Sequence, residues 1–235
     1  MSADIEDGAR HFLSAFADPQ AVSRYAEGPP RFVPGLEALH RMTGILLAEK
    51  APEDAKVLVL GAGGGLELRA LAETQPNWTF VGVDPSVEML RLAERTLGPL
   101  MSRVQLVEGY IDDAPTGPFD AATCLLTLHF LAAPDRQRTV RAIHRRLRSG
   151  APFVAAHGSF PQDPADRAIW LDRYLAYAIA SGAEPDQART AQAAVDSSVN
   201  MLSPEQDESI LSDGGFPDVR LFFAAFTWRG WIAHA

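Results

Sequence analysis

The sequence predicts a doubly wound α/β domain with a mostly parallel sheet, and three observations lead to this fold class. Short apolar runs alternate with helical patterns between residues 56 and 156, which is typical of βαβ units. A glycine-rich turn, Gly61–Gly65, follows the first of these runs. Two adjacent strand patterns, 219–223 and 225–232, predict a closing hairpin.

The composition is that of a globular protein. The chain has 235 residues, 47% apolar and 22% charged, and can bury a core without metals or disulfides. No apolar run approaches the roughly 20 residues of a membrane span, and the acidic N-terminus lacks a signal pattern. The single cysteine, Cys124, fits a reducing cytoplasm. A net charge of −9 argues against a broad nucleic-acid-binding surface without excluding a local basic patch.

Residues 1–50 are expected to form an N-terminal helical cap. Apolar residues recur at helical spacing over 9–17 and 36–50. Between these segments, Glu27–Gly35 contains three prolines and two glycines, which predicts a loop or lid.

Residues 51–158 carry the alternating core. A helix is expected to open at Leu66, a second after the N-cap Ser86, and a third to start after Pro134 and end at Gly150. The strands of this core are predicted at 56–60, 79–83, 104–107, 119–126 and 151–156.

The alternation stops after His157. Two helices, 164–181 and 186–199, form a predicted helical insert over 159–200. The capping box Ser203–Gln206 opens a last helix that ends at Gly214, before the closing hairpin. Residues 201–235 are this last helix and hairpin, and the whole chain is expected to be a single domain.

The glycine turn and Asp84 predict a nucleotide site at the carboxyl end of the sheet. Glycines let the backbone approach a ligand closely, and Asp84 ends the next strand, where a carboxylate can bind both ribose hydroxyls. The spacing is G-x-G-x-G, so the dinucleotide pattern G-x-G-x-x-G fails at Leu66. The absence of a lysine after the glycines excludes a P-loop.

Several motifs resemble those of the class I S-adenosylmethionine (SAM)-dependent methyltransferases over most of residues 20–235. They are Val57–Gly65, Val81–Ser86, Phe119–Ala122, Leu147–Gly150, Phe216 and the closing segment Trp228–Ala233. The resemblance implies a seven-stranded Rossmann-like sheet with a reversed C-terminal hairpin. It also implies SAM as cofactor and S-adenosylhomocysteine as product. The cofactor-binding residues expected from it are Gly61, Ala62, Gly63, Gly64, Asp84, Pro85, Met89, Tyr110, Ile111, Asp112 and Leu125.

Two positions depart from the family pattern. The acidic residue often found two positions before the first glycine is Val59, and the acidic residue that usually faces adenine is Tyr110. Tyr110 is expected to stack on adenine, or Asp112 to bind its exocyclic amine.

Other stretches resemble carboxy-SAM synthase, which prepares a donor for tRNA wobble uridines. They are Phe32–Gly35, Leu126–Leu131 and Gly215-Phe216. However, Leu36 stands where that family has a tyrosine after its Pro-Gly. Gln192 falls near the position of the arginine that binds the extra carboxylate in that family, and Arg189 is three residues away. A carboxylate without a positioned cation is poorly compensated, which favours ordinary SAM and methyl transfer.

The expected catalytic residues are two histidines near the acceptor. His129 follows the fourth strand and is a candidate general base, with the alternative that it fills a loop. His157 ends the fifth strand and is expected to point toward the same cleft edge, with the same alternative. No metal site is predicted.

Two side-chain patterns have a structural and a functional interpretation. The arginines at 138, 141, 145 and 148 form either a solvated helix face or an RNA-binding stripe. The aromatic residues Trp170, Tyr174 and Tyr177 belong either to the core or to a substrate site.

The sequence therefore predicts a SAM-dependent methyltransferase that acts on a small molecule. The alternatives are a relative of carboxy-SAM synthase, an NAD(P)-dependent reductase and a non-catalytic SAM-binding protein. No membrane partner is expected, and the oligomeric state is left open, a homodimer included.

Overall fold

The computed structural model describes residues 28–235 and contains a seven-stranded sheet. Its strands are β1 (Lys56–Leu60), β2 (Thr79–Asp84), β3 (Val104–Glu108), β4 (Ala121–Leu125), β5 (Pro152–Gly158), β6 (Arg220–Ala225) and β7 (Trp228–His234). Their order in space is β3-β2-β1-β4-β5-β7-β6. The first five strands in this order pair in parallel, whereas β7 pairs antiparallel with both β5 and β6. The doubly wound sheet and its reversed C-terminal hairpin are thereby confirmed.

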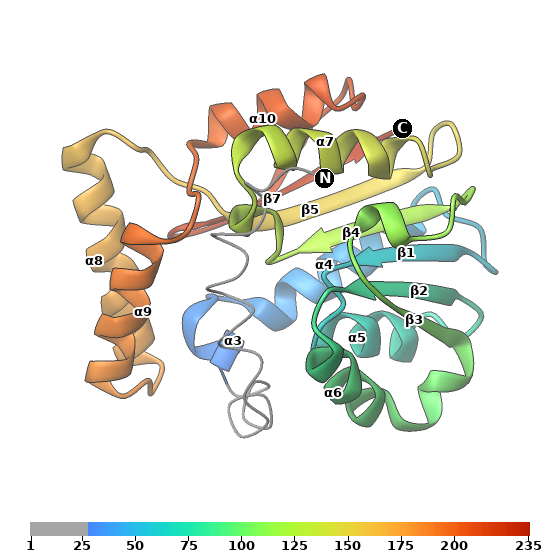
Figure 1. The fold of residues 1–235 in the computed structure, drawn as a ribbon, viewed down its shortest axis with the longest axis horizontal. Helices are drawn as coiled ribbons and strands as arrows, with labels where there is room; N and C mark the ends of the chain where they lie inside the picture. Colours follow the sequence, from blue (N-terminus) through green and yellow to red (C-terminus); the bar gives the residue numbers. More distant parts are fainter. Residues whose placement is uncertain (1–27) are drawn as a thin grey trace.

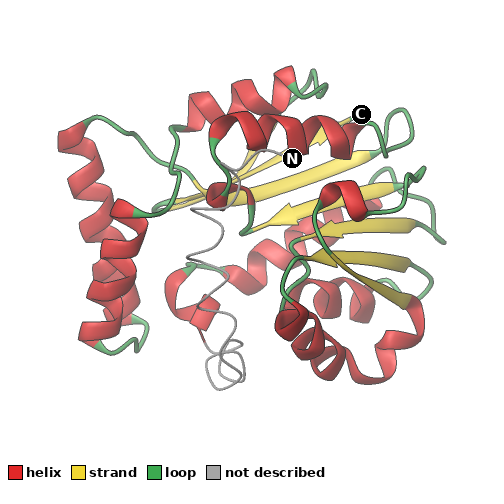
Figure 2. Cartoon of the chain, viewed as in Figure 1, coloured by secondary structure: helices red, strands yellow, loops and turns green. Residues whose placement is uncertain are grey.

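Helices cover both faces of this sheet, as Figure 2 shows. One face packs against α4 (Leu36–Ala48), α5 (Leu66–Thr74) and α6 (Val87–Leu97), and the other packs against α7 (Ala133–His144) and α10 (Pro204–Asp213). Within residues 28–235, none of the helices is long and apolar enough to cross a membrane. The expected helix over 9–17 lies outside the described residues.

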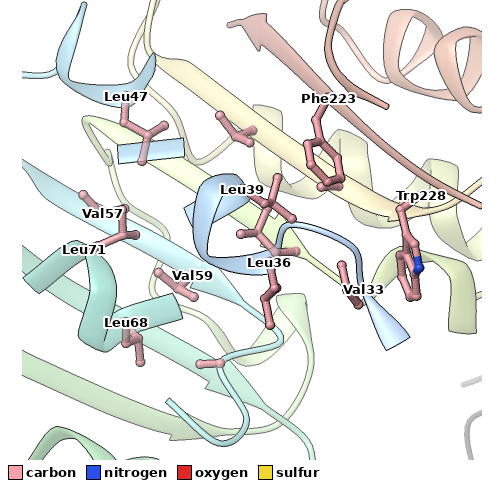
Figure 3. Packing of buried hydrophobic residues seen from close by; sticks show 14 of the residues in the cluster. Val33, Leu36, Leu39, Leu47, Val57, Val59, Leu68, Leu71, Phe223 and Trp228 are labelled. Atoms are coloured by element: carbon pink, nitrogen blue, oxygen red, sulfur yellow. The ribbon is translucent and has the colours of Figure 1, made fainter. Parts of the chain in front are cut away.

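The core between the sheet and the helices α4 and α5 is shown in Figure 3. Leu39 and Leu47, from one stripe of α4, point toward the sheet, where Val57 and Val59 project from β1. Leu68 and Leu71 of α5 complete this layer. Full burial of one such side chain is worth about 1.5–3 kcal/mol, so this face fixes where α5, and with it the glycine turn, begins.

The insert forms two helices, α8 (Pro164–Ala180) and α9 (Pro185–Ser197), which pack against each other at one end of the molecule (Figure 1). Both follow the sequence prediction closely, and each begins with a proline, which lacks the N–H that a first helical turn leaves unpaired.

The interpretation of Glu27–Gly35 as a loop or lid is wrong in part, because Gly28–Phe32 forms the short helix α3. Pro29 and Pro30 occupy its first turn, where the missing N–H costs nothing, and the N–H of Val33 bonds the carbonyl of Pro29 at 2.8 Å. The ring of Phe32 stacks on Tyr174 of α8 at 5.7 Å, so tertiary packing stabilises this turn.

The predicted end of the helix after β4 also needs correction. Helix α7 ends at His144, and Gly150, with φ +77°, lies in the turn that leads into β5. The chain leaves the helix early because Phe119 pairs with its exit segment. The N–H of Phe119 bonds the carbonyl of Arg146 at 2.8 Å, and the N–H of Arg148 bonds the carbonyl of Phe119 at 3.0 Å.

Candidate active site

The glycine turn connects β1 to α5 at the carboxyl end of the sheet. Gly61, Gly64 and Gly65 have φ values of +82°, +76° and +74°, a region that favours glycine strongly. The N–H groups of Gly61 and Ala62 both donate to the carbonyl of Val83, at 2.8 and 3.0 Å. These bonds hold the turn beside the end of β2.

Each glycine of the G-x-G-x-G spacing meets a different close neighbour. A Cβ on Gly61 would lie 1.9 Å from Oγ1 of Thr127, in the loop after β4. A Cβ on Gly65 would lie 2.9 Å from the Cα of Ala93, on α6. A Cβ on Gly63 would lie 2.7 Å from Oδ2 of Asp84. The three positions therefore exclude side chains for three separate steric reasons.

Asp84 is the last residue of β2 and reaches the glycine turn. Its Oδ2 accepts the N–H of Gly63 and its Oδ1 accepts the N–H of Ser86, both at 2.9 Å. Burial raises the pKa of Asp84 to about 6, although the two backbone hydrogen bonds lower it. Each carboxylate oxygen retains a further lone pair, so the group can accept two more hydrogen bonds. The sequence prediction that Gly63 and Asp84 share one site agrees with this contact.

Helix α6 begins directly under the turn. Ser86 caps it as predicted, with its hydroxyl accepting the N–H of Met89 at 3.3 Å. The carbonyl of Met89 accepts the N–H of Gly64 at 3.1 Å. The side chains of Met89 and Ala62 are buried, and Pro85 is partly buried.

The segment after β3 presents three predicted residues in different settings. Tyr110 is 43% exposed and Ile111 is buried. Asp112 is exposed, with its Oδ2 3.4 Å from Nη1 of Arg138. The backbone N–H of Tyr110 bonds Oδ2 of Asp113 at 2.8 Å, which fixes the segment while leaving the phenol ring available.

The loop after β4 is held in an uncommon conformation. Leu125 is buried at the end of β4, and Leu126 follows with φ +55°, a value rare for a residue with a side chain. The N–H of Leu126 bonds the carbonyl of Ala156 at 2.6 Å, and Oγ1 of Thr127 donates to the carbonyl of Leu125 at 2.9 Å. These bonds direct the following 3₁₀ turn η5 (Leu128–Phe130) across the end of the sheet.

His129 lies in this turn with 4% of its surface exposed. Its ring centroid is 4.1 Å from that of Phe130 and 5.6 Å from that of Trp228. The N–H of Gly158 donates to Nδ1 of His129 at 3.3 Å, which places the proton of a neutral ring on Nε2. Burial, with smaller effects from His157 and Arg136, lowers the pKa of His129 well below its usual range, so the imidazole is neutral.

His157 faces helices α7 and α10 rather than the cleft edge that the sequence suggested. Its Nε2 lies 3.2 Å from Oδ1 of Asp207, and its ring is 5.3 Å from that of Trp231. The rings of His157 and His129 are 6.4 Å apart. A catalytic role of His157 stays a prediction, and with this packing it would act through His129.

Three charged residues of this region were not identified from the sequence. Arg136 and Asp207 form a fully buried ion pair between α7 and α10, and Arg136 also bonds the carbonyl of Asn200 at 2.6 Å. A signal existed, because Arg136 shares a helical face with Val140 and Ile143. Glu67 was missed in the same way, on the face of α5 that also carries Leu71.

The other two side-chain patterns are the arginine series on and after α7 and the aromatic residues of α8. The arginine series on and after α7 is exposed at 138, 141, 145 and 148, and two of its members pair with acids, Arg138 with Asp112 and Asp135, and Arg148 with Asp120 at 2.8 Å. Tyr174 belongs to the core.

Comparison with known proteins indicates the class of protein to which this fold belongs. Residues 57–150, from β1 to the turn before β5, match the family model of a methyltransferase domain. The fold, the glycine turn with Asp84 and this match define the chain as a class I SAM-dependent methyltransferase, and SAM is its cofactor. The alternative of a nicotinamide-dependent reductase is thereby set aside.

A carboxy-S-adenosyl-L-methionine synthase of Actinobacillus succinogenes is 27% identical over 208 residues, 86% of each chain. Further relatives with the same name are 21–27% identical. An O-methyltransferase family protein of Burkholderia thailandensis has a similar fold, with a TM-score of 0.69, 17% identity and 94% of this chain covered. Human N-acetylserotonin methyltransferase, solved with SAM, also has a similar fold, with a TM-score of 0.63, 13% identity and 95% of this chain covered. This chain spans 61% and 58% of those two solved chains.

Proposed function

We propose that this methyltransferase transfers the methyl group of SAM to a small-molecule acceptor that binds beside His129. The observation that carries the proposal is the setting of this histidine. It is neutral and almost fully buried at the carboxyl ends of β4 and β5, with Phe130 and Trp228 against its ring. An acceptor group reaching it must leave bulk water, which suits a small apolar molecule better than an exposed segment of a macromolecule.

The residues around the glycine turn fit SAM. Glycine at position 63 leaves room for the carboxylate of Asp84 against the turn, and Asp84 has lone pairs for the two ribose hydroxyls. In this proposal Gly61, Ala62 and Gly64 pass under the methionine part, Pro85 and Met89 support the ribose, and Leu125 lies near the sulfonium. Tyr110, Ile111 and Asp112 bind the adenine.

SAM, when bound, supplies an electrophilic methyl group on a sulfonium that is a good leaving group. The part of this chain is to orient the acceptor and exclude water. With Nδ1 accepting from Gly158, Nε2 of His129 carries a proton and donates a hydrogen bond to an acceptor oxygen or nitrogen. To serve as a general base, His129 would have to move its proton to Nδ1 and give up the bond from Gly158. We further propose that the cap, core, insert and last helix act as one methyltransferase domain.

The test is turnover with a panel of small phenols, alcohols, amines and carboxylic acids, read as S-adenosylhomocysteine formed. The proposal expects turnover with at least one compound and its loss in His129→Phe, with S-adenosylhomocysteine binding unchanged. Methylation of tRNA or protein, with none of any small molecule, would contradict it. Binding of SAM without any turnover would point to a non-catalytic protein.

A second candidate function is synthesis of carboxy-SAM, which the names of the curated relatives favour. The surroundings of Leu36, Gln192 and Arg189 argue against this second function. Leu36 is part of the buried core. Nε2 of Gln192 lies 3.4 Å from Oδ1 of Asp172, and Nη2 of Arg189 pairs with Oδ1 of Asp186 at 2.8 Å while 60% exposed. A cation so exposed and already paired is poorly placed to bind a carboxylate.

Mass spectrometry of the nucleoside that co-purifies with the protein separates the two candidates. Recovery of SAM or S-adenosylhomocysteine agrees with methyl transfer. Recovery of carboxy-SAM would overturn the preference, and Arg189→Ala would then be expected to lose it selectively.

A further inference from the structure

Glu67 is a buried acid without a complete set of partners. It stands in the first turn of α5, two residues after Gly65, with 8% of its surface exposed. Its Oε1 has no hydrogen-bond partner among the described residues. A buried acid that lacks a hydrogen-bond partner lowers the stability of the fold, so its presence here indicates a ligand or another functional role.

The surroundings of Glu67 belong to the cofactor side of the sheet. Thr123 of β4 lies close enough to Glu67 to lower the pKa of its carboxyl group, and Oγ1 of Thr123, like Oε1 of Glu67, has no hydrogen-bond partner among the described residues. Thr123 is in register with Val59 of β1, and Val59 packs on the face that α5 covers. Glu67 therefore lies over the face of the sheet that carries Val59 of β1 and Thr123 of β4, two residues beyond the glycine turn.

The order of the strands gives the direction of a ligand across this turn. Asp84 ends β2, and the neighbouring strands in space are β1 and then β4. A SAM molecule with its ribose at Asp84 extends its other end over β1 toward β4. That end carries the α-ammonium and α-carboxylate of methionine, and only the ammonium is attracted by an acid.

We propose that the carboxylate of Glu67 binds the α-ammonium of SAM, with Thr123 as a neighbouring hydrogen-bond partner. The inference rests on the placement of SAM proposed above. Val59 stands where the family often has an acidic residue. In this proposal Glu67 supplies an acidic group from α5 to the same face of the sheet. Glu67 is thus a specificity-determining residue for the amino-acid part of the cofactor.

Binding of three probes tests this assignment by calorimetry. They are S-adenosylhomocysteine, its analogue without the amino group, and 5′-methylthioadenosine, which lacks the amino-acid part. Glu67→Gln is expected to weaken S-adenosylhomocysteine about 10- to 100-fold, the usual loss for a charge-assisted hydrogen bond, and to leave the other two probes unchanged. Glu73→Gln is the matched control, because Glu73 lies on the same helix but is exposed and paired with Arg69.

Proton release supplies a second readout. Burial raises the pKa of Glu67 to about 8, so the free protein holds this acid protonated at pH 7. A bound ammonium favours the carboxylate, and wild type is expected to release about one proton on binding S-adenosylhomocysteine. Glu67→Gln is expected to lose this release, and Glu73→Gln to keep it.

The outcomes separate this inference from the proposed function. Wild-type affinity for S-adenosylhomocysteine in Glu67→Gln, or equal weakening of all three probes, would overturn the role of Glu67. Failure of wild type to bind any of the three would instead overturn the proposed cofactor site. If Glu67→Gln does not fold, the double variant Val59→Asp/Glu67→Leu returns an acid to the same face from β1. Restored preference for S-adenosylhomocysteine over the deaminated analogue in that variant would support the assignment, and absence of the preference would contradict it.

Discussion

Arg136 and Asp207 form an ion pair in which the two side chains are 1% and 0% exposed, and this pair joins α7 to α10 over the carboxyl half of the sheet. His157 contacts the same carboxylate, with Nε2 3.2 Å from Oδ1. The pair thus anchors the helix that begins just after the His129 turn.

Breaking this pair from one side is expected to destabilise the protein strongly. Asp207→Asn leaves the guanidinium of Arg136 buried without a counter-charge, for a loss of about 3–5 kcal/mol in the free energy of unfolding. Denaturant unfolding monitored by circular dichroism measures it. The double variant Arg136→Met/Asp207→Leu is expected to recover most of the loss, because it removes both charges. A single variant as stable as wild type would contradict the role given to the pair.

The steric requirement at Gly63 predicts a specific loss of cofactor binding. A Cβ in Gly63→Ala would lie 2.7 Å from Oδ2 of Asp84 and would displace the carboxylate from the position in which we propose that it binds the ribose. We expect the affinity for S-adenosylhomocysteine to fall at least about 10-fold, the scale of one charge-assisted hydrogen bond. Gly28→Ala is the matched control, since a Cβ there meets nothing within 4 Å. Equal affinities of the two variants would argue against Asp84 as the ribose ligand.

The pKa of Asp84 predicts how cofactor binding depends on pH. Burial raises this pKa to about 6, and only the ionised carboxylate accepts hydrogen bonds with both oxygens. In the Glu67→Gln background, where the proton release of Glu67 is absent, the affinity for S-adenosylhomocysteine is therefore expected to be constant above pH 7 and to weaken as the pH falls through 6. In the same background, Asp84→Asn should bind more weakly and without this dependence. A Glu67→Gln profile that is flat between pH 5 and 7 would be the contrary result.

Glu67 predicts a pH-dependent stability of the ligand-free protein. Its pKa in the folded state, about 8, lies above its ordinary value of 4.5, so the folded state binds the proton more tightly. The resulting stabilisation is complete below pH 4.5 and is lost as the pH rises to 8 and beyond, by up to about 5 kcal/mol. Thermal unfolding of wild type and Glu67→Gln across this range measures the difference. Parallel curves for the two proteins would be inconsistent with a buried, protonated acid.

Substitutions of His129 distinguish a hydrogen-bond donor from a base. His129→Gln retains a hydrogen-bond donor and is expected to keep part of the turnover. His129→Phe has no donor and is expected to lose the turnover. Because the pKa of His129 is held well below its usual range, no ionisation of this residue should appear near pH 6.5 in the rate profile. Equal loss in both variants, together with such an ionisation, would favour general-base catalysis.

The parts of the site that follow from local sequence were predictable. The G-x-G-x-G spacing, Asp84 at a strand end and the Ser86 cap depend on residues close together in the chain, and the structure brings Gly63 and Asp84 into contact. Arg136 and Asp207 are 71 positions apart, so their pairing depends on how α10 packs, which no local pattern encodes.

The other misses have equally physical reasons. The prolines of residues 27–35 suggested a loop, yet a helix tolerates proline in its first turn when tertiary contacts stabilise that turn. Glu67 resembled an ordinary surface acid, because its burial comes from the sheet beneath α5.

The bond between Nε1 of Trp228 and the carbonyl of Phe32, at 2.9 Å, connects residues 196 positions apart. The same indole packs edge-on against the ring of His129. A shift of α3 would therefore pass through one rigid aromatic ring to His129, the residue that we propose to face the acceptor. With the acceptor placed as we propose, substrate preference would respond to changes in α3 that touch neither the cofactor nor the acceptor.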